Sequence, residues 1–272
     1  MVQAHQYKVL LIGSGLMTPP LVDYLCKFSD THITVASNIL EDGQRIAARH
    51  PAHMSAIYLD VLDPVAIEAA VTGKNLVISF IPPWMHMKVL PVCVRVGVNV
   101  TTSSYISPEM LELDAEAKQK GLVILNECGL DPGIDILGTM KVVHEAQAAG
   151  HKVVSYESYC GGIPVAEQAD NPLGYKFSWN PGASIKASKN TAIFMKDGQR
   201  VVTNEPLKHV QNHDDVSVAM KLEAYPNRDS TVFMDRMGMG NCHTFIRGTY
   251  RFEGFSSVSN QNKTILENLI SL

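Results

Sequence analysis

The first half of the chain alternates short apolar segments with segments of helical periodicity, and this alternation is the feature that most restricts its fold. Six segments have the length and composition of buried strands; they cover residues 8–13, 31–37, 55–60, 75–81, 98–102 and 121–127. Five helix-like segments separate them, at residues 19–28, 40–49, 64–71, 85–96 and 108–119. Such alternation builds right-handed βαβ units around a parallel sheet. We therefore expect an α/β fold whose first part is a Rossmann-type, doubly wound parallel sheet.

The pattern changes beyond residue 131. A long helix is expected over residues 132–149, with Asp131 as its N-cap, Pro132 at its first position and Gly150 after its end. Strand-like runs follow at residues 191–195, 200–203, 216–225 and 243–252. We predict an NAD(P)-binding Rossmann domain over residues 1–131 and a second α/β domain with a mixed sheet, the substrate domain, over residues 132–272.

Composition argues against two classes of function. The formal net charge of −4 offers no basic excess, so no nucleic-acid partner is expected. No stretch approaches the roughly 20 apolar residues of a membrane span, so no membrane partner is expected either. The five cysteines are far apart and form no CxxC pair, which supports neither a disulfide framework nor a metal site. A reducing compartment, most simply the cytoplasm, is expected.

The segment GSGLMT, residues 13–18, keeps two of the three glycines of a GxGxxG turn after the first strand. The first glycine permits the tight turn, and the second lets the backbone approach a pyrophosphate. Thr18 replaces the third glycine, whose purpose is close packing of helix on strand. An ordinary βα turn is the alternative interpretation. The position after the first of six strands favours dinucleotide binding.

The position that would select between the two nicotinamide cofactors is neutral. An acid at the end of the second strand would bond the ribose 2′-OH of NAD, and a base would meet the 2′-phosphate of NADP. Asn38 lies there, and Asp42 and Arg45 follow with opposite charges. The residues therefore leave both NADP and NAD open.

Hydroxyl groups follow the fifth predicted strand. Ligands of open α/β sheets lie at the carboxyl ends of the strands. Ser103, Ser104 and Tyr105 place three hydroxyls at that edge. Helix entry is the alternative interpretation of the serine run; it explains Ser107 as an N-cap but leaves Tyr105 unexplained.

Asp131 and His86 each have a structural interpretation beside a functional one. Capping of the next helix explains Asp131, yet the same carboxylate would also stand at the ligand-binding edge. His86, at a helix start in an apolar run, is more often a packed residue than an acid or base.

Six segments, in this order, resemble the saccharopine dehydrogenases of the glutamate-forming type, also called saccharopine reductases: SSYISP, GLDPGID, SYCGG, DNPLGYKFSW, YPNRDST and IRGTYRF. The resemblance covers residues 8 to about 255 and implies a Rossmann domain followed by an α/β substrate domain. Families that make carboxynorspermidine or homospermidine are the alternative. The long YPNRDST and DNPLGYKFSW segments argue against them.

The resemblance implies a reversible reaction of lysine metabolism. 2-Aminoadipate 6-semialdehyde condenses with glutamate, and NADPH or NADH reduces the imine to saccharopine. This reaction serves lysine biosynthesis and, in reverse, lysine breakdown. Saccharopine, glutamate and the semialdehyde are the small-molecule partners that it implies, and a homodimer is left open as the assembly.

Matching by motif also implies the site residues. The implied cofactor-binding residues are Ser14, Gly15, Leu16, Met17, Asn38, Ile81, Ser103, Ser104, Tyr105 and Leu130. The implied substrate-binding residues are Ser104, Tyr105, Asp131, Arg228, Thr249, Tyr250 and Arg251. Tyr105, Asp131 and Cys160 are the catalytic candidates, with Cys160 in the same cleft, and no metal is implied.

The chemistry of the implied substrate agrees with these residues. Saccharopine has three carboxylates, which favour bidentate arginines, and Arg228, Arg247 and Arg251 are available. Solvated surface arginines are the alternative interpretation. Asp131 would pair with an ammonium group. Imine reduction depends mainly on positioning, so both Tyr105 and Asp131 stay open as groups that assist proton movement.

The sequence departs from the family pattern at two places. Asn38 is neither the basic residue of NADP-using relatives nor the acid of NAD-using ones. The family resemblance ends near Phe255, and the following segment SSVSNQNKTILENLISL is expected to be a divergent end of a shortened chain. This end makes a non-catalytic form that binds only nucleotide or a partner the second functional hypothesis.

Overall fold

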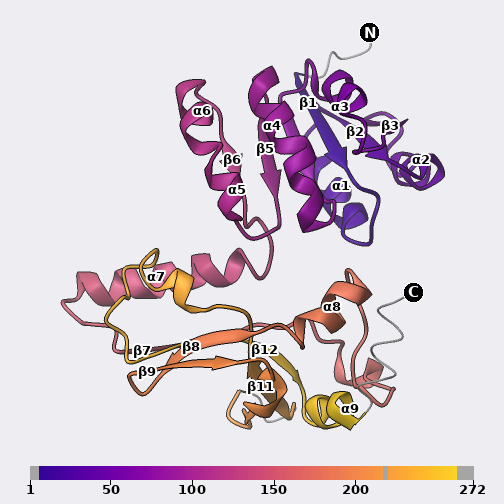
Figure 1. The fold of residues 1–272 in the computed structure, drawn as a ribbon. Helices are drawn as coiled ribbons and strands as arrows, with labels where there is room; N and C mark the ends of the chain where they lie inside the picture. Colours follow the sequence, from indigo (N-terminus) through magenta and orange to yellow (C-terminus); the bar gives the residue numbers. More distant parts are fainter. Residues whose placement is uncertain (1–5, 217–219, 262–272) are drawn as a thin grey trace. The chain divides into compact units, whose positions relative to one another are not determined.

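A computed structural model describes residues 6–216 and 220–261, and the chain divides into two compact units (Figure 1). The first unit covers residues 1–133 and the second covers residues 134–272. Among the described residues, the helices are too short or too polar to cross a lipid bilayer.

The first unit is a parallel sheet with the strand order β3-β2-β1-β4-β5-β6. Its strands are β1 (Tyr7–Ile12), β2 (Thr31–Ser37), β3 (Met54–Tyr58), β4 (Leu76–Ser79), β5 (Asn99–Thr102) and β6 (Ile124–Leu125). Its helices are α1 (Thr18–Leu25), α2 (Leu40–Ala47), α3 (Pro64–Val71), η1 (Pro83–Met85), α4 (His86–Val96), α5 (Pro108–Leu111) and α6 (Asp114–Gln119). This strand order is that of a Rossmann fold, which confirms the predicted fold class.

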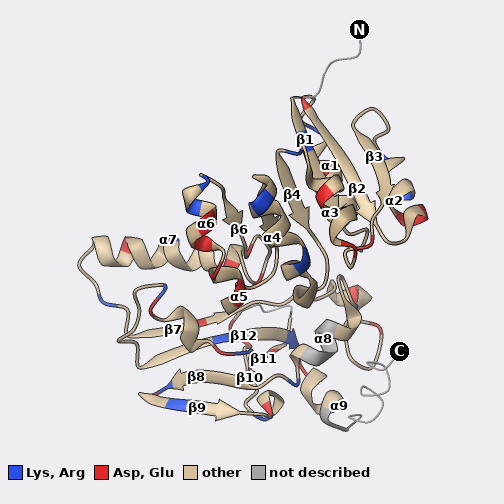
Figure 2. Ribbon diagram, turned by 45° about the horizontal axis from the view of Figure 1, so that its top comes forward, with Lys and Arg blue, Asp and Glu red and all other residues tan. Residues whose placement is uncertain are grey.

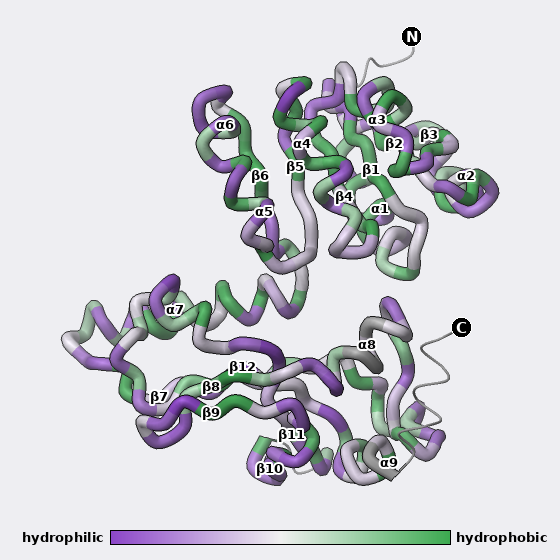
Figure 3. The backbone as a smooth tube through the Cα atoms, viewed as in Figure 1, coloured by the Kyte–Doolittle hydropathy of each residue, from purple (hydrophilic) through white to green (hydrophobic). Residues whose placement is uncertain are grey.

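Helices bury both faces of this sheet. In β1, Leu10 and Ile12 pack on one side with residues of α3 and α4, whereas Val9 and Leu11 pack on the other side with residues of α1 and α2. Figure 3 shows β1 and β4 as largely hydrophobic, and Figure 2 shows charged residues on helices such as α2 and α6. A strand covered on both sides has to be apolar nearly throughout, which explains the apolar runs in the sequence.

The predicted elements differ from the observed ones near the sixth strand. The helix predicted over residues 108–119 is two short helices, α5 and α6. Ser107 caps α5 as predicted, because its Oγ accepts from the Met110 N–H at 3.4 Å. The strand predicted over residues 121–127 is reduced to the two residues of β6, which pairs with β5 alone at the edge of the sheet.

The helix predicted to begin at Pro132 with Asp131 as its cap is wrong at its start. The helix is α7 (Ile134–Ala148), and the Asp131–Pro132 peptide bond is cis. The Gly129 N–H donates to the Pro132 carbonyl at 2.9 Å. Gly133 has a φ of 149°, and a Cβ atom there would collide with the Gly129 backbone. These residues form a turn of their own, so Asp131 is not the N-cap residue of α7.

The second unit is a mixed sheet built around β12 (Thr244–Phe252), in agreement with the predicted second domain type. β12 pairs antiparallel with β11 and β8 and parallel with β7. The other strands are β7 (Ser155–Tyr159), β8 (Ala192–Lys196), β9 (Gln199–Thr203), β10 (Gln211–Asn212) and β11 (Leu222–Pro226). The helices after α7 are η2 (Ala166–Gln168), α8 (Pro181–Ala187), η3 (Pro206–Lys208), η4 (Thr231–Phe233) and α9 (Phe255–Gln261). Residues 217–219 of the strand predicted over 216–225 lie outside the described residues.

Two buried arginines project from one face of β12. Arg247 is 4% exposed, donates through Nη2 to Asp135 Oδ2 of α7 at 2.5 Å, and lies 4.2 Å from the centre of the Phe233 ring. Arg251 is 5% exposed and lies 4.5 Å from the centre of the Tyr175 ring. The interpretation of these arginines as solvated surface charges is therefore wrong. A carboxylate and aromatic faces replace their hydration.

Replacement of Asp135 by Ala removes this carboxylate from a guanidinium that remains buried. We expect the free energy of unfolding of the second unit to fall by about 3–5 kcal/mol, the usual result of breaking a buried ion pair. Urea denaturation followed by the fluorescence of Trp179, in a Trp84→Phe background, would measure it. Glu205→Ala is the matched control in the same unit, because it breaks the exposed Lys208–Glu205 pair and should cost less than about 1 kcal/mol. Equal effects of the two substitutions would contradict the structural importance of the Asp135–Arg247 pair.

Candidate functional site

The candidate cofactor site is the carboxyl edge of the first sheet, where the loops after β1, β2, β4, β5 and β6 begin. Three hydroxyl residues end strands at this edge, namely Ser37 in β2, Ser79 in β4 and Thr102 in β5. All three are buried. Each of them is hydrogen-bonded to residues that follow its own strand or another strand of the sheet. These bonds connect the segments after the strands into a polar rim at the end of an apolar sheet.

The turn after β1 has the geometry expected of a dinucleotide-binding turn. Gly13 has a φ of 117°, and an added Cβ atom would lie 2.5 Å from the Phe80 carbonyl oxygen, so only glycine fits. An added Cβ atom at Gly15 would meet nothing within 4 Å, which leaves open space beside the backbone. Thr18 is fully buried at the third glycine position and donates from Oγ1 to the Gly13 carbonyl at 3.1 Å. The threonine therefore stabilises the turn that a glycine would merely permit.

The end of β2 lies beside this turn. The Ser37 hydroxyl lies 2.8 Å from that of Ser14 and accepts from the Ile39 N–H at 3.0 Å. Asn38 is exposed at the same strand end. Arg45 is paired with Asp42 at 2.6 Å, so these opposite charges largely cancel at the surface of α2.

His86 connects the ends of β4 and β5. It is fully buried at the start of α4, with Nδ1 2.9 Å from Ser79 Oγ and Nε2 2.8 Å from Ser104 Oγ. Burial lowers the pKa of His86 to about 4, so its imidazole is neutral near pH 7. The interpretation of His86 as a packed residue is correct, and the residue also holds one of the predicted site hydroxyls.

Tyr105 and Asp131, two of the three catalytic candidates, are hydrogen-bonded to each other. The Tyr105 hydroxyl donates to Asp131 Oδ1 at 2.6 Å, and both side chains are half-buried. Glu127, which follows β6, holds the loop that carries Tyr105 through two hydrogen bonds. Its N–H donates to the Ser104 carbonyl at 3.0 Å, and its Oε1 accepts from the Ile106 N–H at 3.2 Å. This phenol–carboxylate pair can hold or pass a proton at the rim.

The remaining cofactor candidates lie on the same loops. Leu16 and Met17 are 62% and 49% exposed in the turn after β1, and Leu130 is 51% exposed in the loop before Asp131. Ile81 and Ser103 are partly buried after β4 and β5. Exposed apolar side chains at a polar rim provide surface for a ring or ribose to cover.

In the second unit, the predicted residue Cys160, which follows β7, is hydrogen-bonded to the backbone of β12. The Cys160 N–H donates to the Gly248 carbonyl at 3.1 Å, and the Tyr250 N–H donates to the Cys160 carbonyl at 3.3 Å. The Tyr250 ring lies 5.5 Å from the Tyr159 ring, and burial raises the pKa of Tyr250. Thr249, on the other face of β12, is 9% exposed.

The three candidate arginines differ in position. Arg228 is exposed, with a φ of 55°, in the loop after β11. Arg251 lies with Tyr175, Phe177 and Phe255 around a very small cavity, and its Nη1 donates to the Tyr250 carbonyl at 2.7 Å. Arg247 is held by Asp135, as described above. Of the three, Arg228 alone presents its side chain to solvent without any movement of the fold.

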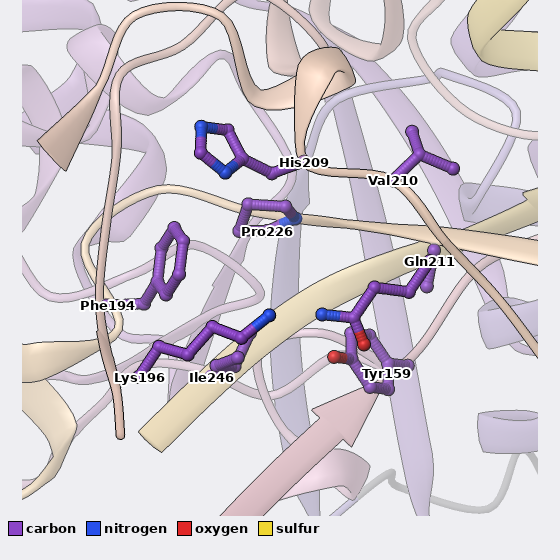
Figure 4. A pocket seen from close by; sticks show the side chains of 9 residues that line it. Tyr159, Phe194, Lys196, His209, Val210, Gln211, Pro226 and Ile246 are labelled. Atoms are coloured by element: carbon purple, nitrogen blue, oxygen red, sulfur yellow. The ribbon is translucent and has the colours of Figure 1, made fainter. Parts of the chain in front are cut away.

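A separate, open pocket lies on the other face of the second sheet (Figure 4). Phe194 and Ile246 line it with apolar side chains, and Lys196 of β8 and Gln211 of β10 line it with polar ones. None of its nine lining residues is a predicted site residue.

The sequence patterns missed three residues that the structure connects to the candidates. Ser79 and Ser37 hold His86 and Ser14, and Asp135 holds Arg247. The serines were recognisable as hydroxyl residues at the ends of apolar strands. Asp135 lies within the GLDPGID segment, but its partner is 112 positions away, so no local signal identifies the pair.

The fold and this rim define a class of protein, the two-unit α/β proteins with a Rossmann-type dinucleotide-binding unit. The family model of the saccharopine dehydrogenase NADP binding domain matches residues 9–125, and that of the saccharopine dehydrogenase C-terminal domain matches residues 129–271. The chain belongs to the saccharopine dehydrogenase family. The second match also extends past Phe255, so the expectation that family character ends there is wrong.

Curated relatives and a solved structure agree with this assignment. Saccharopine dehydrogenase [NADP(+), L-glutamate-forming] of Saccharomyces cerevisiae is 42% identical over 248 residues, which cover 91% of this chain and 55% of that protein. The mitochondrial alpha-aminoadipic semialdehyde synthase of Rattus norvegicus is 33% identical over 255 residues, covering 93% of this chain and 27% of the synthase. The apo structure of the Saccharomyces cerevisiae enzyme matches with a TM-score of 0.84 and 40% identity, over 92% of this chain and 56% of that one. The chain thus spans about half the length of these saccharopine dehydrogenases.

The neutral state of His86 predicts a pH-dependent stability. An unfolded histidine has a pKa of about 6.5, whereas burial lowers that of folded His86 to about 4. Between these values the unfolded state binds more protons, so stability is lost as the pH falls through this window. We expect His86→Gln to remove this part of the acid sensitivity, on the order of 3 kcal/mol at most. Urea denaturation of both proteins from pH 7 to pH 4 would measure it; parallel stability curves would contradict a neutral buried His86.

Proposed function

We propose that this chain is an NADP-dependent saccharopine dehydrogenase of the glutamate-forming type. Its reaction would be the reversible reductive condensation of 2-aminoadipate 6-semialdehyde with glutamate. The observation that supports this proposal most is the agreement of both units with saccharopine dehydrogenase family models, together with 42% identity to an enzyme of that name. The alternative of a non-catalytic nucleotide-binding or partner-binding form is not favoured by these relatives.

The proposed cofactor fits the residues of the first unit. Open space beside Gly15 and the N–H groups of residues 14–17 suit a pyrophosphate. We propose NADP rather than NAD because the matching family model and the yeast relative are both NADP-binding. Asn38 would contact the ribose that carries the 2′-phosphate. The nicotinamide end of the cofactor would contact Ile81, Ser103, Ser104 and Leu130. When bound, the reduced cofactor supplies the hydride for the imine carbon.

The proposed substrate calls for groups of opposite charge. Asp131 would attract an ammonium group, and its hydrogen bond with Tyr105 keeps its carboxylate in place. Arg228 is exposed and suits a carboxylate, which its guanidinium can bind through two parallel hydrogen bonds. Thr249, Tyr250 and Arg251 would contribute through the end of β12, with Cys160 beside them. Arg247 is not proposed as a substrate residue, because it is buried and paired with Asp135.

The proton needed when an imine becomes an amine has a source in this arrangement. The Tyr105 hydroxyl and the Asp131 carboxylate share a hydrogen at the rim. We propose that this pair orients the substrate nitrogen and takes or gives its proton. Cys160 is proposed as a lining residue of the same reaction.

Two further expectations stay predictions, and the direction of the reaction in lysine metabolism is left open between biosynthesis and breakdown. A homodimer is the assembly to test first, and a reducing compartment such as the cytoplasm is supported by the free thiols of all five cysteines.

The proposed activity is tested by incubating the purified chain with NADPH, glutamate and 2-aminoadipate 6-semialdehyde. We expect loss of NADPH absorbance that requires both other substrates, and saccharopine as the product by mass spectrometry. Thermal stabilisation by NADPH without any turnover would contradict the enzyme and favour the non-catalytic alternative.

Arg228→Ala tests the assignment of a substrate carboxylate. The variant should raise the KM for saccharopine by about tenfold to a hundredfold, since a charge-assisted pair contributes about 1.5–3 kcal/mol. The Kd for NADP+ should stay within about twofold. Arg200→Ala, at another exposed arginine of the same unit, is the control and should change neither value. An equal loss of saccharopine and cofactor affinity would remove Arg228 from the substrate site.

A further inference from the structure

A chain of two hydrogen bonds links Ser79, His86 and Ser104, and the direction of both bonds can be derived from the chemistry of the three groups. Ser79 is 1% exposed, and among the described residues its hydroxyl has one hydrogen-bond partner, Nδ1 of His86. The hydroxyl carries one hydrogen, which burial separates from water. A neutral imidazole has one donor nitrogen and one acceptor nitrogen, so the direction of the Ser79 hydrogen bond fixes the direction at Ser104.

Only one tautomer satisfies the buried hydroxyl. If Nδ1 carried the hydrogen, the Ser79 oxygen would accept it, and its own O–H would be a buried donor without an acceptor, at a cost of about 1–3 kcal/mol. If Nε2 carries the hydrogen, Ser79 donates to Nδ1 and every group is satisfied. The Nε2–H then donates to Ser104 Oγ, 2.8 Å away.

We infer that Ser79 fixes His86 in the Nε2–H tautomer, and that His86 thereby makes Ser104 a hydrogen-bond donor toward its ligand. Ser104 Oγ accepts from His86, so its own hydrogen is left to point to the half-buried rim. The backbone of Ser104 cannot take over this function, because its N–H donates to Thr102 Oγ1 at 3.0 Å and its carbonyl accepts from Glu127.

The consequence is a rule for what Ser104 binds. The free O–H of Ser104 favours a ligand acceptor, such as a carbonyl, carboxylate or phosphoryl oxygen. A ligand N–H or ammonium group could use only the second lone pair of Oγ and would leave the O–H hydrogen without a ligand partner. His86 is thus a positioning residue that acts through Ser104. This inference rests on the proposed function for the identity of the ligand, which is NADP+ or saccharopine, but not for the tautomer.

The tautomer is measured first, without any ligand. Long-range proton–nitrogen NMR of the chain with ¹⁵N-labelled histidine, assigned with His86→Gln, should give a pyridine-type Nδ1 and a pyrrole-type Nε2 for His86. A pyrrole-type Nδ1 would overturn the inference. This result is independent of activity, so it also separates failure of the inference from failure of the proposed function.

A double-mutant cycle then tests the link to the ligand, with NADP+ and saccharopine titrated separately by calorimetry. Ser79→Ala should weaken one of the two ligands by about threefold to tenfold, the value of one hydrogen bond, and should have no further effect in a Ser104→Ala background. The ligand that responds is the source of the acceptor oxygen. Ser55→Ala is the matched control, because it removes another serine–histidine hydrogen bond, to His32, outside the rim. Additive losses in the cycle would overturn the inference, since they would mean that Ser79 acts on the fold and not through Ser104.

Discussion

The burial of both faces of the parallel sheet determines where polar chemistry lies in the first unit. Helices cover the strands on both sides, so the strand interiors have little place for hydroxyl or charged groups. Apart from Thr34 in the middle of β2, the buried polar side chains of these strands lie at strand ends. The carboxyl ends of parallel strands share one edge. Ser37, Ser79 and Thr102 are the last residues of their strands and bond the loops there. The rim that we propose to bind NADP is a direct result of this constraint.

The second unit shows how charge is accommodated inside a small mixed sheet. Arg247 and Arg251 lie on the same face of β12, one beside a carboxylate and aromatic ring and the other against aromatic rings. Such a buried guanidinium is fixed in place, and it costs much more to leave unpaired than a surface arginine. We therefore expect Arg247 to serve the fold and exposed Arg228 to serve a ligand, although the sequence presents them as equivalent candidates.

The strands and most helices of the first unit could be predicted because their signals are local. An apolar run of four to seven residues between turn residues is visible without any knowledge of partners. The start of α7 could not be predicted, because Pro132 suits a first helical position equally well and the turn of residues 129–133 depends on a bond between Gly129 and Pro132. The burial of Arg247 could not be predicted for a related reason, because its partner Asp135 lies 112 positions away in the sequence. Ser104 and Tyr105 were identified as rim residues, but His86 as the holder of Ser104 required the fold.

We propose that the edge of the first sheet binds NADP through the turn after β1. A crystal structure of the chain grown with NADP+ would show where the cofactor binds. We expect the pyrophosphate to accept hydrogen bonds from the N–H groups of residues 14–17, with the nicotinamide near Ser104. A pyrophosphate bound elsewhere, with the turn of residues 13–18 in contact with solvent alone, would contradict the claim.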